Sequence, residues 1–63
     1  MKKLAMNYMK GELKQMPKKA VADIYYNLLK ESGKAVVRED LNKYSKDQLI
    51  YNYGKLRNKI MLS

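Results

Sequence analysis

The strongest repeating pattern of hydrophobic and polar positions lies in residues 46–61. Four hydrophobic residues there follow one another at intervals of four, three and four: Leu49, Tyr53, Leu56 and Ile60. These intervals place them on one side of an α-helix. Ser45, followed three residues later by Gln48, forms a capping-box pattern that marks a helix start. The sequence therefore predicts a helix over 46–61, with its polar side turned away from the core.

A second helical pattern covers residues 17–32. Its hydrophobic positions are Val21, Ile24, Tyr25, Leu28 and Leu29. Pro17 suits a first helical turn, because its missing N–H is not needed there. Gly33 suits the position just after a helix, where the backbone often turns left-handed. We therefore expect a helix over 17–32.

Two weaker patterns flank these segments. Residues 2–16 carry a stripe at intervals of three, four and three: Met6, Met9, Leu13 and Met16. Methionine packs adaptably, and Gly11 costs a helix about 1 kcal/mol, so we expect a loosely packed helix whose stripe is a candidate partner-binding surface. The stretch 35–37 is β-prone, and 38–44 is long enough for one and a half helical turns.

Together these segments predict an all-α fold of three to four helices near 2–16, 17–32, 38–44 and 46–61. With 63 residues, the chain 1–63 has room for a single small domain with a thin core. The expected core residues are Val21, Ile24, Tyr25, Leu28, Leu41, Leu49, Tyr53, Leu56 and Ile60.

The composition favours polyanionic partners. Lys and Arg number 14 against 6 Asp and Glu, a formal net charge of +8. Only Arg38 and Arg57 are arginines, and lysine suits phosphate contact better than bidentate base recognition. The absence of Cys and His excludes disulfides, thiolate sites and imidazole metal sites, and we expect no cofactor. No apolar run approaches the ~20 residues that span a bilayer, so we expect a soluble, cytoplasmic protein.

The polar side of 46–61 is the candidate binding surface. It combines cations, amides and one tyrosine: Lys46, Gln48, Tyr51, Asn52, Lys55, Asn58 and Lys59. Lysine neutralises phosphates, Gln and Asn can pair with adenine edges, and tyrosine can contact a phosphate or a thymine methyl. The competing interpretation is an ordinary solvated helix face.

The order of elements from residue 18 onward resembles the helix-turn-helix core of winged-helix DNA-binding domains, in a form without the wing. The matching segment is VVREDLNKYSKDQLIYNYGKLRNKIMLS, residues 36–63, and its Lys55-to-Leu62 stretch is similar to the KLxxKGLL ending of a recognition helix. The turn is shorter than in that family, and the small residue and Gly between its helices are missing. The resemblance implies a DNA-binding regulator that uses helix 46–61, with DNA favoured over RNA. A dimer would add specificity, and the methionine stripe is a candidate surface for it.

The composition is also compatible with two other kinds of partner. A small phage-type adaptor or inhibitor could use the same basic residues, together with Met and Tyr side chains, to bind an acidic surface on a host protein such as a nucleic-acid enzyme. A membrane surface is a third polyanion, although the apolar side of 46–61 is needed for the core. Catalysis is not expected. The Glu39–Asp40 pair suits the first turn of a short helix, and the three glycines are isolated and form no phosphate loop.

Overall fold

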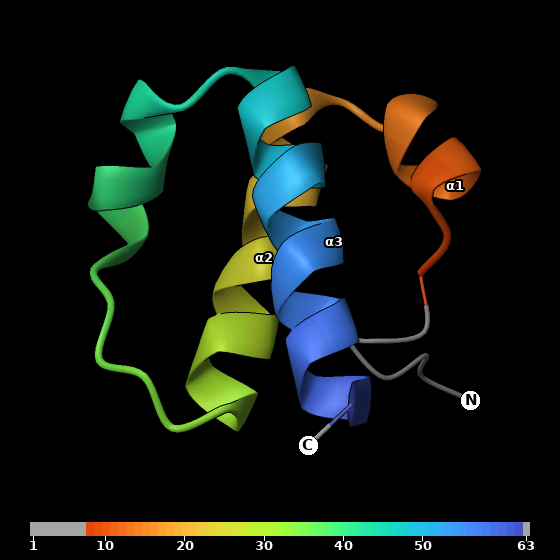
Figure 1. Cartoon of the computed structure of the whole chain (residues 1–63). Coiled ribbons are helices and arrows are strands. Elements are labelled where there is room, and N and C mark those ends of the chain that lie inside the picture. The colour runs from red at the N-terminus through yellow and green to blue at the C-terminus, as the bar shows by residue number, and fades with distance from the viewer. Residues whose placement is uncertain (1–7, 63) are drawn as a thin grey trace, which may run out of the picture.

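The computed structural model describes residues 8–62, and in this range it contains four helices and no strand (Figure 1). They are α1 (Lys10–Lys14), α2 (Lys18–Glu31), the 3₁₀ helix η2 (Arg38–Lys43) and α3 (Lys46–Leu62). The predicted all-α class is confirmed. The predicted boundaries of the two long helices, 17–32 and 46–61, are correct to within one residue.

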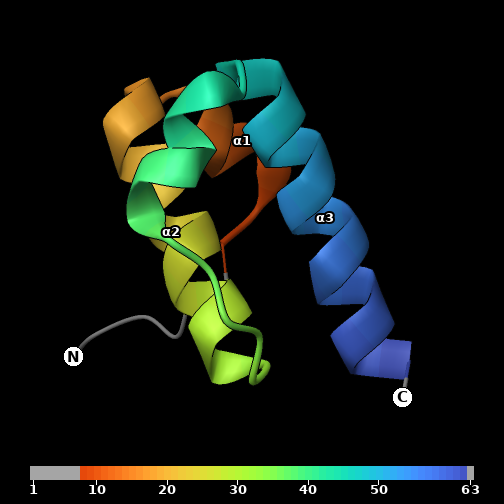
Figure 2. The same ribbon diagram turned by 90° about the vertical axis from the view of Figure 1, so that its left-hand side faces the viewer.

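The two long helices lie side by side and run in the same direction (Figures 1 and 2). The connector after α2, which includes η2, returns the chain to the end at which α2 began, and α3 starts there. η2 packs against α2, and α1 packs against α3. As a result α3 has α2 on one flank and α1 on another, while its remaining side is open to solvent.

Local sequence sets both ends of α2. Pro17 occupies the N-cap with extended backbone angles of φ −67° and ψ 158°. Beyond the last turn, Gly33 adopts φ +84°, a left-handed conformation that glycine accepts without strain. The backbone N–H of Gly33 donates to the carbonyl of Lys30, and that of Lys34 to the carbonyl of Leu29, both at 3.0 Å. This is a Schellman motif, which satisfies the last carbonyls of the helix and turns the chain.

The core is wider than the predicted stripes. Six of the nine expected residues are buried, whereas Ile24, Tyr25 and Ile60 are only partly buried and pack against the core. Four residues outside the expected core list are also buried: Leu13, Ala22, Leu29 and Ile50. The buried sector is wider because each long helix is covered by two neighbours, α3 by α1 and α2, and α2 by α3 and η2.

The N-terminal helix is shorter than predicted. Within the described residues it covers only Lys10–Lys14, and the first part of the predicted range, 2–7, lies outside them. Met9 is extended, with φ −89° and ψ 154°, so the helix cannot start before Lys10. Its end follows from Pro17, because a residue that precedes proline is disfavoured in the helical conformation.

The predicted short helix over 38–44 is present, but it is a 3₁₀ helix over Arg38–Lys43. Its flanking bonds join residues three apart, from Asp40 N–H to Val37 and from Tyr44 N–H to Leu41. The β-prone residues before it form no strand, although Val37 is extended. A segment this short is the usual setting of a 3₁₀ helix, in which each hydrogen bond joins residues only three apart.

Candidate nucleic-acid interface

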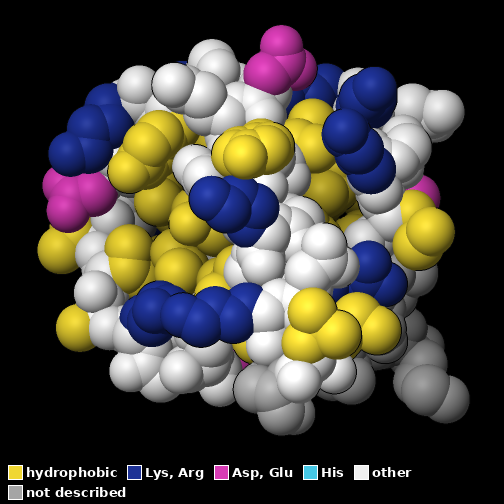
Figure 3. Space-filling model, viewed as in Figure 1, with side chains coloured by type: hydrophobic (Ala, Val, Ile, Leu, Met, Phe, Trp, Pro, Cys, Tyr) yellow, Lys and Arg dark blue, Asp and Glu magenta, His cyan; other side chains and the backbone are white. Residues whose placement is uncertain are grey.

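Most of the predicted interface residues lie on the solvent side of α3. Gln48, Lys55, Asn58 and Lys59 are exposed, and the Tyr51 side chain is 64% exposed. Asn52 is half-buried at the border of this side. We call the set Tyr51, Lys55, Asn58 and Lys59 the basic face. In Figure 3 Lys and Arg side chains lie over this side of the molecule, and the acidic side chains of the described residues lie at its margins.

Lys46 has a different position from the one predicted. It is half-buried, and its Nζ donates a hydrogen bond of 2.6 Å to the backbone carbonyl of Lys14. Lys14 is the last residue of α1, where unpaired carbonyls and the helix dipole favour a cation. Lys46 therefore joins the start of α3 to the end of α1 and does not belong to the basic face.

Gln48 is exposed, but its side-chain amide oxygen already accepts a hydrogen bond. Its Oε1 accepts a hydrogen bond of 2.9 Å from the Ser45 backbone N–H, and the Ser45 Oγ accepts one of 3.2 Å from the Gln48 backbone N–H. This confirms the predicted capping box. Because the amide oxygen caps the helix, pairing of Gln48 with an adenine edge would compete with the start of α3.

Tyr51 and Lys55 form a pair on the basic face. The Lys55 Nζ lies 5.4 Å from the centroid of the Tyr51 ring, within the range of a cation–π contact. The two residues are four apart, so they occupy successive turns on the same side of α3. The pair places a large aromatic surface beside a positive charge, the combination that proteins use to bind bases and phosphates of single strands.

The predicted partner-binding stripe does not form one exposed surface. Leu13 is fully buried in the core, and Met16 is half-buried and packs against it. Met9 is 58% exposed, and Met6 lies outside the described residues. The prediction is therefore wrong for Leu13, which α3 covers within the same chain, because α1 packs on α3.

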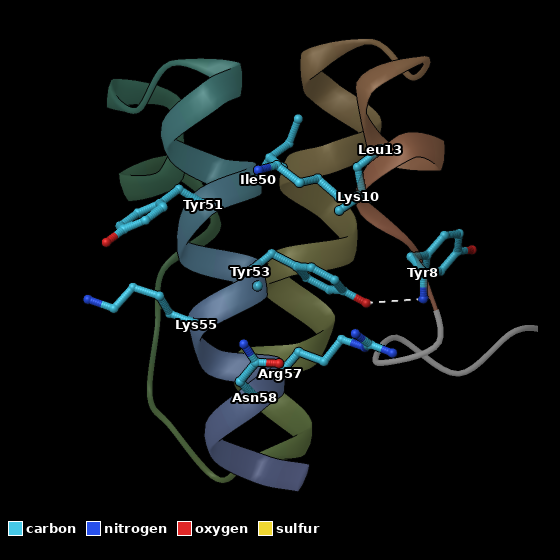
Figure 4. A pocket seen from close by; sticks show the side chains of 10 residues that line it. Tyr8, Lys10, Leu13, Ile50, Tyr51, Tyr53, Lys55, Arg57 and Asn58 are labelled. Carbon is cyan, nitrogen blue, oxygen red and sulfur yellow. Dashed lines mark hydrogen bonds between the residues drawn. The ribbon is translucent and has the colours of Figure 1, made fainter. Parts of the chain in front are cut away.

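A hollow of about 300 Å³ lies between α3 and the segment that leads into α1 (Figure 4). We call it the Gly54 pocket. It is lined by Tyr8, Lys10, Leu13, Ile50, Tyr51, Tyr53, Gly54, Lys55, Arg57 and Asn58. In Figure 4 Tyr51 and Lys55 extend to one side of α3, and Tyr8, Lys10 and Arg57 lie toward the other.

Sequence reasoning missed this pocket because its lining comes from two distant segments. Tyr8, Lys10 and Arg57 belong to no predicted stripe or face, and Gly54 is one of the three isolated glycines of the sequence. One signal was present in the sequence: a glycine inside a strongly helical segment costs about 1 kcal/mol relative to alanine, which calls for a reason.

Tyr53 forms one wall of the pocket and belongs to the core. Its ring is 2% exposed, and its hydroxyl accepts a hydrogen bond of 3.3 Å from the backbone N–H of Tyr8. Burial raises the pKa of Tyr53, and the Tyr8 N–H and the Arg57 cation partly offset that rise. Burial, with a smaller effect of Tyr44, also raises the pKa of Tyr25. Both phenols stay neutral at physiological pH.

The comparisons with known proteins add no relative. No protein-family model, curated protein or solved structure matches the chain. Across residues 8–62, none of the helices has the length and apolar character needed to span a membrane. The resemblance to winged-helix domains therefore stays a prediction.

Proposed function

We propose that this protein binds nucleic acid through the basic face of α3, as a small DNA-binding regulator. The observation that carries the proposal is the charge of α3. The helix contains Lys46, Lys55, Arg57 and Lys59 but only one acid, Asp47, which lies in its first turn. The exposed part of the helix beyond Tyr51 has no carboxylate to repel a phosphate backbone.

Each member of the basic face has a role in this proposal. Lys55 and Lys59 neutralise phosphates, which gives affinity and salt dependence without sequence preference. Asn58 lies between them along the helix and Tyr51 lies one turn before Lys55, and these two are the groups available to bases. Gln48 contributes less, because its amide caps α3. With so few base-reading groups, the specificity of one copy is low, and two copies on adjacent half-sites would raise it.

The test is a salt titration of a double variant, Lys55→Ala with Lys59→Ala. Both side chains are exposed, so the fold should be retained. We expect weaker binding to every duplex sequence and a reduction of about one to two in the slope of log K against log salt, measured by fluorescence anisotropy. A wild-type protein that binds no DNA even at about 50 mM salt would overturn the proposal.

The matched control removes two lysines elsewhere, Lys34→Ala with Lys43→Ala. Both are exposed and lie outside α3, so the loss of net charge is the same. This control should lose less affinity than the α3 double variant. Equal losses would mean that net charge alone attracts DNA and that the basic face has no special role.

A protein partner is the second candidate, and the end of α3 favours it. Met61 is 60% exposed and Leu62 is 87% exposed, so large hydrophobic side chains stand beside the lysines of the same helix. Such anchors beside cations suit an acidic protein surface. A pull-down after nuclease treatment separates the candidates. A single stoichiometric protein that survives nuclease supports this second function, and loss of all partners supports nucleic acid.

A further inference from the structure

Gly54 lies in the middle of α3 at a position where the fold does not require glycine. Of the glycines in the described residues, only Gly33 has a positive φ, so the backbone at Gly54 suits any residue. A Cβ built on Gly54 meets no atom within 4 Å, so no neighbour approaches too closely for a side chain. Glycine inside a helix is less stable than alanine there. Its effect at this position is to leave a wall of the Gly54 pocket open.

The lining of the pocket has the chemistry of a nucleotide site. Its floor includes the buried side chains of Leu13 and Ile50, and its rim carries three cations, Lys10, Lys55 and Arg57. None of the lining residues is an acid. Asp47 belongs to the adjoining hollow, with Lys10 and Lys14. An anionic ligand with a flat apolar part matches this combination of floor and rim.

The size of the pocket restricts what can enter it. Its volume of about 300 Å³ is at the lower end for small-molecule sites. A paired base in a duplex is stacked between its neighbours, so it reaches such a pocket only after it leaves the stack. An unpaired base is available without that cost, and the Tyr51 ring at the rim offers a surface for stacking.

We infer that the Gly54 pocket receives one unpaired base of a single-stranded nucleic acid, whose neighbouring phosphates contact Lys10, Lys55 and Arg57. This inference rests on the proposed function and adds a preference for single strands to it. Because every base has an aromatic face, the pocket accepts bases with little regard to sequence.

The experiment fills the pocket with a side chain introduced at Gly54. Gly54→Leu places a side chain in the open space, and leucine is a good helix former. The matched control is Gly11→Leu, since Gly11 is also helical, also has no atom within 4 Å of an added Cβ, and does not line the pocket. Circular dichroism and thermal melts confirm the fold of both variants, and Gly54→Ala serves as a smaller substitution.

Binding is measured with single-stranded DNA, single-stranded RNA and duplex DNA of the same sequence, each of roughly 12 nucleotides or base pairs. We expect wild type to prefer the single strands. Gly54→Leu and Tyr51→Ala should each weaken single-strand binding about tenfold, as for the loss of one stacked base. Gly11→Leu should leave it unchanged, and Gly54→Leu should weaken duplex binding much less than single-strand binding.

The possible failures are distinguishable. Equal wild-type affinity for single strands and duplex, with no effect of Gly54→Leu, overturns the pocket inference and leaves the proposed function in place. If Gly54→Leu weakens the binding of single strands and of duplex equally, the pocket inference is also overturned, because the substitution would then act on the whole surface. Absence of binding to any polymer overturns the inference together with the proposed function.

Discussion

The hydroxyl oxygen of Tyr53 lies 3.3 Å from the backbone nitrogen of Tyr8 and accepts its hydrogen bond. The two residues are 45 positions apart in the sequence. Since the Tyr53 ring is packed in the core, the bond fixes the segment before α1 against α3. One side chain thus completes the core and shapes the wall of the Gly54 pocket.

Replacing Tyr53 by Phe tests this bond. The ring packing is retained and the acceptor is lost, so the free energy of unfolding should fall by about 0.5–1.5 kcal/mol in urea denaturation. Hydrogen exchange at the Tyr8 amide should accelerate. Tyr51→Phe is the control, because it makes the same chemical change on an exposed ring. Equal stability of the two variants would show that the bond contributes nothing.

Two phenols with raised pKa values predict a loss of stability at alkaline pH. The pKa values of Tyr25 and Tyr53 are raised in the folded protein. The folded protein therefore binds these two protons more tightly than the unfolded chain does. The stabilisation is complete below the unfolded pKa of about 10, and it is lost as pH rises through the higher folded values. Thermal melts between about pH 9 and 11 should show a falling midpoint.

A control variant separates the effect of these two phenols from other effects of alkaline pH. Tyr25→Phe removes one of the two phenols and should flatten the decline between about pH 9 and 11. Tyr51→Phe, on the exposed ring, should leave the decline as in wild type. A Tyr25→Phe profile that parallels wild type would contradict the prediction.

Arg38 should be a stronger link between α2 and η2 than a lysine. Its Nε lies 2.7 Å from the Asp23 Oδ1, and its Nη1 and Nη2 donate to the Asn42 Oδ1 at 3.1 Å and the Lys19 carbonyl at 3.4 Å. Lysine keeps the charge but cannot reach three acceptors in different directions.

Arg38→Lys should therefore lower the free energy of unfolding by about 0.5–1 kcal/mol, and less at high salt, because the side chains are partly solvated. A double-mutant cycle with Asp23→Asn isolates the ion pair from the other two bonds. If Arg38→Lys is as stable as wild type in urea, the guanidinium is not a structural link.

Buried core residues should be the positions at which truncation of a side chain lowers stability most. Leu28 is 1% exposed between the two long helices, and Leu28→Ala should cost about 2–5 kcal/mol. That loss is comparable with the whole stability of so small a domain, so the variant should be largely unfolded at room temperature. Leu62→Ala makes the same change at an 87% exposed position and should be neutral. Circular dichroism measures both, and a folded Leu28→Ala would contradict the assigned core.

The sequence was sufficient to predict the two long helices. When one side of a helix is buried, hydrophobic residues recur about every 3.6 positions, and this recurrence is visible in the sequence. The sequence was insufficient for Ala22 and Ile50, which flank the predicted stripes and are buried. Such positions are buried only when a second element covers the flank, and the sequence does not reveal that element. For the N-terminal helix, hydrophobic spacing does not show that Met9 is extended and that the helix starts at Lys10, while Pro17 limits only the other end of the helix.

The candidate site, too, could be predicted only in part from the sequence. The basic face follows from helical spacing alone, and the structure places Lys55 and Lys59 where the spacing predicts. The roles of Lys46 and Gln48 depend on contacts at the start of α3. The Lys14 carbonyl that Lys46 reaches lies 32 residues away, so no local pattern reveals it. The Gly54 pocket is also lined by two segments that are far apart in the sequence, so no local pattern predicts it.

The parallel course of α2 and α3 constrains how the chain can fold and how it can be shortened. α2 has 14 residues and is therefore about 21 Å long, so at least about seven extended residues are needed to return to its starting end. The two helices cannot form a local hairpin, and their contact must wait until the loop between them closes, which slows folding relative to a hairpin of equal size. A deletion that leaves fewer residues in this connector would make the parallel arrangement of α2 and α3 impossible.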